Sequence, residues 1–528
     1  MKKLIFIAAA IFLLPFIGMK GTPAGNPVAS QPQSSSRADN APSKSSGQSG
    51  YISPTPGRFP IIAYSPVTDE RIPTKADFDT LAACGFNCAM TLFNHDEYFD
   101  LMGEIKDLGI TFIPILDNYT NRKDCEGIKE FIANTRQFMH DNDIPDSLIG
   151  GYRIKDEPWY NVIDSVVVPC YNAAKSEDPK ALPIVNLPAQ PTGNFRPLKI
   201  SHSYSSDPHK RDTMSMYLNH FCDIVHPDVL SYDYYPFLYR FSTDAIEVND
   251  SDFYYNLQLF ARLSKEKGIP FWAFCQSSNV RFCKLHDQEY TEHPEATENF
   301  LRYEAFSALA FGAKGINYWR YSNRRDDLSQ VKFVDGEYVG QYTEYLSALT
   351  DTLGNCEPAW KCAQTVNREI KRYEEVFLGA ELRSYSFFDS GLNTDRYVRP
   401  TDGADIPEYD GLIDIKAVSG KGVLVSHLYK NGLNHIILVN QDPFNSTKVK
   451  IGYWDGRVAI IAMKCDGLHM FNPGGFHNPF DGTTDKDDPD IRRPWGSYVT
   501  EEITLEPGGY HIKHYLIYAS SNENGDEV

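Results

Sequence analysis

The run LIGGYRIKDEP, residues 148–158, is one of eight short apolar segments that end in polar residues and decide the fold of this chain. Three such runs precede it and four follow it: FPIIAYSPV (59–67), FNCAMTLF (86–93), ITFIPIL (110–116), LPIVNLP (182–188), DVLSYDYYPF (228–237), PFWAFCQ (270–276) and AKGINYWRY (313–321). Helix-like amphipathic segments separate neighbouring runs. Strands that alternate with helices in this way form a parallel sheet covered by helices.

Eight such units in succession predict a closed (β/α)₈ TIM barrel over residues 55–380. Gly85, Gly109, Gly268 and Gly312 stand where a helix must end before the next strand begins. After the eighth strand we expect a long helix that contains residues 342–349. An open doubly wound sheet is the alternative, but it would need a glycine-rich phosphate loop, and the sequence has no GxGxxG pattern.

Beyond residue 380 the pattern changes to alternating strands joined by turns. The runs are GVLVSHLY (422–429), HIILVNQ (435–441), KVKIGYW (448–454), RVAIIAMK (457–464) and YHIKHYLIY (510–518). Successive short strands with turns predict a C-terminal antiparallel β-sandwich domain over residues 381–528.

The N-terminus predicts export. Lys2 and Lys3 precede an apolar run, residues 4–17, that is shorter than the ~20 residues that span a bilayer. This is the layout of a cleaved signal peptide, which we assign to residues 1–25; a membrane anchor is the alternative. Residues 26–54 are poor in apolar side chains and predict a flexible linker. The mature protein would be secreted to the periplasm or cell surface, with no membrane span.

Charge and composition indicate which classes of binding partner this protein has. The net charge of −19 argues against a nucleic-acid partner, because phosphate backbones are bound by basic surfaces. Ten cysteines occur without a CxxC pair or metal-ligand spacing, so we expect no metal and no cofactor. An acidic loop at residues 481–490 lacks the EF-hand spacing. The 32 tyrosines favour a carbohydrate partner, since aromatic faces stack on sugar rings, although aromatic residues also fill cores.

Polar residues gather at the C-terminal ends of the predicted strands, where barrel enzymes keep their active sites. Carboxylates there are Asp117, Asp156, Glu157 and Asp233. Amides and aromatic side chains accompany them: Asn94, Asn186, Gln276, Asn317, Tyr232, Tyr234 and Trp319. This combination is typical of a carbohydrate site.

The predicted barrel resembles the four-seven superfamily (clan A) of retaining glycoside hydrolases, which includes β-galactosidase-like enzymes. KDEP (155–158) is similar to the end of that group's strand four, and GAKGINYWRY (312–321) to its strand eight. The resemblance implies that Glu157 is the general acid and that Trp319 is the floor of a sugar subsite. The sequence departs from the group at two positions: Asp156 stands where an Asn is usual, and Gln276 where the nucleophilic Glu is expected.

Glycoside cleavage normally needs two carboxyl groups, so the second one remains open between Asp233 and Asp156. Neighbouring Asp156 and Glu157 also resemble the pair of substrate-assisted hexosaminidases, in which Tyr232 or Tyr234 would take the tyrosine's part. The leading hypothesis is a secreted hydrolase of a polysaccharide or oligosaccharide. The competing hypothesis is a catalytically silent barrel that binds glycans, which the replacement at Gln276 favours.

Overall fold

The computed structural model describes residues 53–68, 71–93, 95–189, 208–240, 243–284, 290–334, 337–388, 406, 413–454, 458–464, 467–471 and 498–517. Its centre is a barrel of parallel strands in the order β3-β2-β1-β12-β9-β6-β5-β4. Their bounds are β1 Ile61–Tyr64, β2 Cys88–Thr91, β3 Thr111–Pro114, β4 Gly151–Asp156, β5 Leu182–Leu187, β6 Leu230–Tyr232, β9 Phe271–Gln276 and β12 Ile316–Trp319. Bridges from Phe112 to Ile149 and from Ile115 to Arg153 join β3 to β4 and close the barrel. The eight predicted barrel strands are confirmed.

The inside of the barrel is a packed apolar core below the mouth. It contains Ile62, Cys88, Met90, Ile113, Ile115, Leu182, Ile184, Val229 and Trp272. Trp272 is fully buried and needs Gly315 opposite it, because a Cβ atom at Gly315 would lie 2.7 Å from Trp272 Cδ1. The filled interior restricts ligands to the polar residues at the strand ends.

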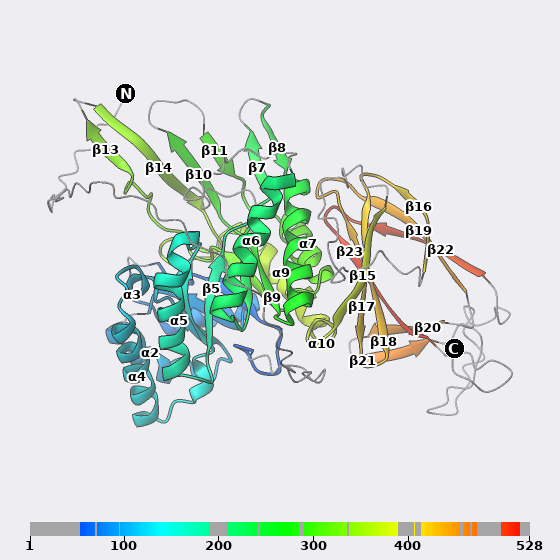
Figure 1. Cartoon of the computed structure of the whole chain (residues 1–528). Coiled ribbons are helices and arrows are strands. Elements are labelled where there is room, and N and C mark those ends of the chain that lie inside the picture. The colour runs from blue at the N-terminus through cyan, green and yellow to red at the C-terminus, as the bar shows by residue number, and fades with distance from the viewer. Residues whose placement is uncertain are drawn as a thin grey trace, which may run out of the picture. The chain divides into compact units, whose positions relative to one another are not determined.

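Helices cover the outside of the barrel (Figure 1). They are α1 Lys75–Cys84, α2 His95–Ile105, α3 Asp117–Asn121, α4 Cys125–Asp141, α5 Val168–Glu177, α6 Pro208–Val225, α7 Asp250–Lys267, α8 Glu298–Ala310, α9 Pro358–Arg372 and α10 Glu374–Phe377. Gly85, Gly109, Gly268 and Gly312 all have positive φ, as expected for residues that end helices before a strand.

The helix predicted over residues 342–349 is wrong. These residues lie in or just after strand β14 (Glu337–Ser347), and the helix that follows the eighth barrel strand is α9. The segment EYVGQYTEYLS is rich in Tyr, Thr and Val, which favour strands, and β14 pairs with β10 and β13 along its length.

Three hairpins that follow β6, β9 and β12 join into one antiparallel sheet, hereafter the mouth sheet. Its strands are β7 Phe237–Arg240, β8 Ala245–Val248, β10 Asn279–Lys284, β11 Tyr290–His293, β13 Val331–Val334 and β14, in the order β13-β14-β10-β11-β7-β8. The hairpins leave the C-terminal ends of adjacent barrel strands, so the mouth sheet extends from the mouth of the barrel (Figure 1).

The C-terminal strands form two antiparallel sheets, in the orders β15-β17-β18-β23-β20-β21 and β16-β19-β22. Their bounds are β15 Glu381–Phe388, β16 Asp414–Ser419, β17 Val423–Lys430, β18 Leu433–Asn440, β19 Thr447–Trp454, β20 Val458–Lys464, β21 Gly467–Phe471, β22 Tyr498–Leu505 and β23 Tyr510–Ile517. Residues of both sheets, among them Val423, Leu438 and Ile451, share one apolar core. The fold is therefore a TIM barrel followed by a β-sandwich.

Several predictions fall on residues outside this description. They are the signal peptide at 1–25, nearly all of the linker at 26–54, Asn94 and the acidic loop at 481–490. Among the helices that the structure describes, none is long and apolar enough to cross a bilayer.

Candidate active site

The end of β4 is held by the buried Arg153 and by Asp117, which follows the neighbouring barrel strand β3. Asp117, the first residue of α3, accepts hydrogen bonds from Arg153 Nε at 2.9 Å and from the backbone N–H of Asp156 at 2.8 Å. Arg153 Nη1 also lies 3.5 Å from Asp156 Oδ2. Asp117 therefore lies at the barrel mouth and positions the last residues of strand β4.

Glu157 leaves the strand in an uncommon backbone conformation. Its φ is +35°, in the left-handed region that non-glycine residues seldom adopt, and such strain is frequent at functional sites. The backbone N–H of Glu157 donates to Asn186 O at 2.8 Å, and Tyr217 of α6 donates to Pro158 O at 2.8 Å. These two bonds hold the turn, while the side chain of Glu157 is exposed.

Asn186 links two of the predicted carboxylates. Its buried Nδ2 group donates to Asp156 Oδ1 and to Asp233 Oδ1, each at 3.1 Å, and its Oδ1 accepts from Ser231 at 3.0 Å. The two carboxyl groups fix which way round the amide lies, because a serine hydroxyl can either donate or accept. Asp156, Asn186 and Asp233 therefore form one hydrogen-bonded chain across β4, β5 and the end of β6.

Asp233 lies in an environment that favours its protonated form. Burial raises the pKa of Asp233 well above its ordinary value, and the negative charges of Glu157 and Asp156 raise it further. Hydrogen bonds from Asn186 and Tyr235 oppose this rise.

Aromatic side chains connect Asp233 to Trp319. Tyr235 donates to Asp233 Oδ2 at 3.3 Å, and its ring centroid lies 5.2 Å from that of Trp319. His293 of β11 lies 5.5 Å from the Tyr235 ring and 6.4 Å from the Trp319 ring. Burial lowers the pKa of His293 to about 4, so its imidazole is neutral at neutral pH. The Trp319–Arg320 peptide bond is cis.

Two of the predicted tyrosines do not join this group. Tyr232 is buried in the core, where its ring stacks on Phe260 of α7 at 3.9 Å. Tyr234 is half-buried, and after burial the charges of Asp252 and Asp250 of α7 contribute most to its raised pKa. Side chains alternate along an extended chain, so Tyr235, and not its neighbours, shares a side with Asp233.

Gln276 lies at the expected strand end, but its amide is engaged by the backbone. Its Oε1 accepts from Phe237 N at 3.3 Å, and its Nε2 donates to Phe237 O at 3.2 Å. The backbone N–H of Gln276 donates to both carboxylate oxygens of Glu304, at 3.1 Å each. In this arrangement Gln276 anchors the start of β7.

Asn317 lies deeper, on β12 two residues before Trp319. Its amide is fully buried, and neither its nitrogen nor its oxygen has a hydrogen-bond partner within the described part of the chain. Asn317 thus belongs to the barrel interior below the mouth. The structure supplies no description of Asn94.

Metal-binding chemistry has no support among the described side chains. They contain no group of three or more His, Cys, Asp or Glu residues arranged to hold an ion. The carboxylates at the mouth instead contact Asn186, Arg153 and Tyr235. The amide of Asn186 and the phenol of Tyr235 can also donate hydrogen bonds to sugar hydroxyls.

Sequence reasoning missed Tyr235 and His293. Tyr235 lies in the run that was considered, and the alternation of side chains from Asp233 would have identified it. His293 had no such signal, because it reaches the site on the mouth sheet, whose pairing depends on three separate hairpins.

A family model of known proteins matches part of the chain. Residues 199–338 match the family model described as beta-galactosidase (Glyco_hydro_42). The matched segment contains Asp233, Gln276 and Trp319 but not Glu157. No curated protein matches the chain.

Solved structures of glycosidases are similar to the chain at low sequence identity. A beta-galactosidase from the haloarchaeon Halorubrum lacusprofundi is 12% identical with a TM-score of 0.38, over 59% of this chain and 58% of that one. A glucosidase from Croceicoccus marinus is 8% identical with a TM-score of 0.37, over 87% and 96% of the two chains. A protein described as a glycoside hydrolase is 11% identical with a TM-score of 0.45, over 88% and 93%. The present chain thus spans 58% of the haloarchaeal enzyme.

Over residues 199–338 the family match agrees with the resemblance to β-galactosidase-like glycoside hydrolases noted in the sequence.

Proposed function

We propose that this chain is an exported glycoside hydrolase that cleaves a polysaccharide or an oligosaccharide, with Glu157 as general acid and Asp233 as the second carboxylate. The observation that carries the proposal is the hydrogen-bonded chain Asp156–Asn186–Asp233 beside Trp319 at the barrel mouth. It supplies carboxylates, an amide donor and an aromatic face, which are the groups that glycoside cleavage uses.

The coupling between Glu157 and Asp233 supports acid catalysis. Burial and the charges of Glu157 and Asp156 raise the pKa of Asp233 well above its ordinary value, which favours a proton on Asp233 close to Glu157. A proton donor is needed at the glycosidic oxygen as that bond breaks. We assign the donor to Glu157 because its side chain is exposed and accessible to an entering glycan, whereas Asp233 is half-buried.

Two variants test these roles once a screen of plant, mucin and algal glycans has supplied a substrate. Glu157→Gln should lower turnover of the natural glycan by a factor of ~10² or more but should slow a dinitrophenyl glycoside much less, because that leaving group departs without a proton. Asp233→Asn should slow both substrates. Glu130→Gln, an exposed change on α4, is the matched control and should leave both rates unchanged. Full activity of Glu157→Gln on the glycan would exclude the proposed acid.

The alternative is a glycan-binding barrel without catalysis. The amide of Gln276, bonded to the backbone of Phe237, favours this alternative because it puts no carboxylate at the end of β9. Calorimetric binding of a glycan that the protein never hydrolyses, even on prolonged incubation, would support it. Hydrolysis that Asp233→Asn abolishes would exclude it.

Export is tested separately from catalysis. The basic start and short apolar run support removal of the first ~20 residues on secretion. N-terminal sequencing of the secreted protein should begin between residues 21 and 31. Protein that retains Met1 in the membrane fraction would show that the segment is an anchor.

A further inference from the structure

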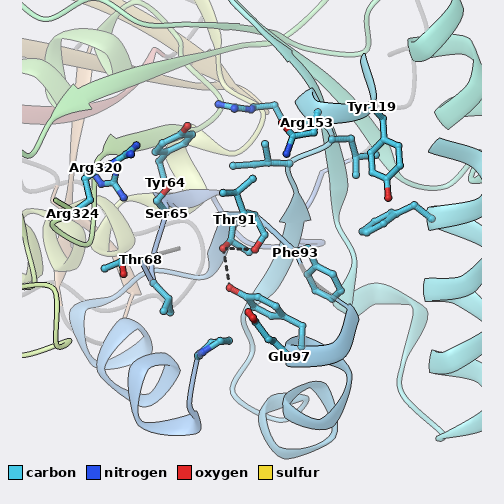
Figure 2. Close-up of a pocket in the computed structure, with 18 of the residues that line it drawn as sticks. Tyr64, Ser65, Thr68, Thr91, Phe93, Glu97, Tyr119, Arg153, Arg320 and Arg324 are labelled. Atoms are coloured by element: carbon cyan, nitrogen blue, oxygen red, sulfur yellow. Dashed lines mark hydrogen bonds between the residues drawn. The ribbon is translucent and has the colours of Figure 1, made fainter. Parts of the chain in front are cut away.

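A pocket of about 680 Å³ opens at the ends of β1, β2 and β3, next to the candidate active site (Figure 2). Its volume lies within the ~300–1,000 Å³ of pockets that hold drug-sized ligands, which are larger than a single sugar ring. Asp156, Glu157 and Asp233 do not line this pocket, so it is a separate space beside the carboxylates.

The pocket borders the candidate active site at two places. Arg153, which lines the pocket, has its Nη1 atom 3.5 Å from Asp156 Oδ2. Arg320, which also lines it, directly follows Trp319 in the chain. Figure 2 shows Arg320 and Tyr119 at opposite sides of the pocket. A glycan chain that is cleaved at the carboxylates can therefore continue into the pocket without leaving the mouth of the barrel.

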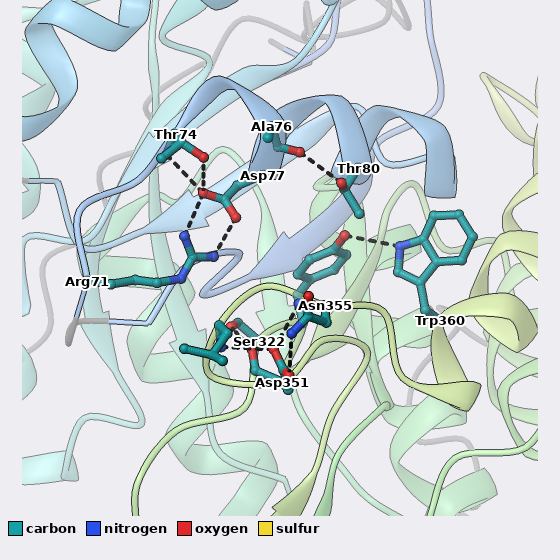
Figure 3. A network of polar contacts seen from close by, with 11 residues as sticks. Arg71, Thr74, Ala76, Asp77, Thr80, Ser322, Asp351, Asn355 and Trp360 are labelled. Atoms are coloured by element: carbon teal, nitrogen blue, oxygen red, sulfur yellow. Dashed lines mark hydrogen bonds and ion pairs between the residues drawn. The ribbon is translucent and has the colours of Figure 1, made fainter.

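Contacts within the protein hold the pocket in shape. At the start of α1, Arg71 forms a two-pronged ion pair with Asp77, with Nη1 and Oδ2 2.8 Å apart (Figure 3). The hydroxyl groups of Thr91 and Tyr98 lie 2.9 Å apart. All of these residues except Asp77 line the pocket. A ligand would therefore meet side chains that are already ordered, which lowers the entropic cost of binding.

The short helix α3 forms another wall of the pocket and is fixed to β4. Asp117 accepts the hydrogen bonds from Arg153 and from the backbone of Asp156 described above. Three residues further on, Thr120 donates to Ile154 O at 2.6 Å. Because β4 leads directly into the proposed general acid, these bonds keep α3 at a fixed distance from the place of cleavage.

The side chains that α3 contributes to the pocket are polar. Asn118, Tyr119 and Asn121 all line it; the two asparagines are exposed and Tyr119 is half-buried. The guanidinium of Arg122 lies 5.3 Å from the centroid of the Tyr119 ring. Within the described part of the chain, neither the two amides nor the Tyr119 hydroxyl forms a hydrogen bond. Amide and phenol groups donate and accept hydrogen bonds, as sugar hydroxyls also do.

We propose that this pocket is a second glycan subsite, in which Asn118, Tyr119 and Asn121 bind a sugar unit beyond the two that the cleaved bond joins. The substrate is then an oligosaccharide or polysaccharide chain longer than a disaccharide. The inference rests on the proposed function, because it takes the cleaved bond to lie at the carboxylates beside Trp319.

Calorimetric binding to the full mature protein tests the inference, in the Glu157→Gln background so that turnover does not interfere. The probes are three series of oligosaccharides, from β-1,4-galactan, β-1,4-mannan and β-1,3-glucan, each running from the disaccharide to the pentasaccharide. We expect the affinity in at least one series to rise ~10-fold or more with chain length, as hydrogen bonds to α3 are added.

The double change Asn118→Ala and Asn121→Ala should remove most of this rise and leave binding of the disaccharide unchanged. Tyr119→Phe keeps the packing of the ring and should weaken binding of the longer chains alone, by about fivefold for one lost hydrogen bond. Asn172→Ala is the matched control, because Asn172 is an exposed asparagine of α5 that does not line the pocket.

An affinity that does not rise with chain length in any series would overturn the inference, as would a rise that the α3 variants leave intact. A rise that depends on α3, without hydrolysis of any chain by the wild-type protein, would refute the proposed hydrolase and leave the subsite standing. Hydrolysis that requires Glu157 but is unaffected by the α3 variants would refute the subsite alone.

Discussion

Replacement of Asn186 by Ala should weaken the site in a way that depends on pH. The change removes three hydrogen bonds of an almost fully buried amide: two of 3.1 Å to Asp156 and Asp233, and one of 3.0 Å from Ser231. A hydrogen bond to a charged group contributes about 1.5–3 kcal/mol, and one between neutral groups about 1 kcal/mol. The bond to Asp233 therefore costs less to lose when Asp233 is protonated than when it is ionised.

The direction of the pH dependence follows from the pKa of Asp233, which burial already raises above its ordinary value. A carboxyl group whose pKa is raised on folding stabilises the protein at low pH and costs stability as pH rises toward the folded-state pKa. Loss of the Asn186 donor raises that pKa further. The loss of unfolding free energy in Asn186→Ala should thus be larger at alkaline pH than at acidic pH, by about 0.5–2 kcal/mol for the bond to Asp233.

Urea unfolding at several pH values, monitored by tryptophan fluorescence, measures this difference without a substrate. Asn256→Ala is the control: Asn256 is a buried asparagine of α7 whose Nδ2 donates to the backbone oxygen of Asp252 at 2.8 Å. Its cost should be nearly constant with pH. A cost for Asn186→Ala that does not vary with pH, or that parallels the control, would refute the role of Asn186 as a donor to ionised carboxylates.

Three further predictions concern other parts of the barrel. Because burial lowers the pKa of His293 to about 4, stability should be full above pH ~6.5 and fall by about 3 kcal/mol as pH decreases toward 4; His293→Phe should flatten that loss in pH-dependent urea titrations. The sulfur atoms of Cys125 and Cys170 lie 3.6 Å apart, so oxidised glutathione should join them, with loss of two hydrogen atoms by mass spectrometry, and Cys125→Ser should prevent it. Gly315→Ala should cost about 1–3 kcal/mol by collision with Trp272, measured by urea unfolding, and should be partly relieved by Trp272→Phe; an unchanged midpoint would contradict it.

The sequence predicted the barrel well because each barrel strand carries its own local signal. Runs such as residues 110–116 are almost entirely apolar, as expected for strands that are buried on both faces, and a glycine or polar turn bounds each of them. The turn at Glu157 and the amide at Asn186 were also predictable as strand ends, since parallel strands bring their carboxyl ends to one mouth.

The rest depends on contacts between distant segments. The expected helix over residues 342–349 is at odds with the Tyr, Thr and Val residues of β14, which favour a strand, and pairing with β10 and β13 stabilises that strand. Tyr232, Tyr234 and Tyr235 are identical residues whose side chains point in different directions. Only the alternation of side chains at the end of the strand distinguishes Tyr235, which contacts Asp233.

The mouth sheet has a consequence for how this protein can evolve. In a barrel with independent loops, each loop can be lengthened or exchanged while its neighbours keep their conformation. Here β11 pairs with β7, and β10 pairs with β14, so the segments after three barrel strands share one hydrogen-bonded register. An insertion in one hairpin would shift pairing partners in the other two. Diversification of substrate range on this side of the barrel should therefore proceed by point substitutions on a fixed frame.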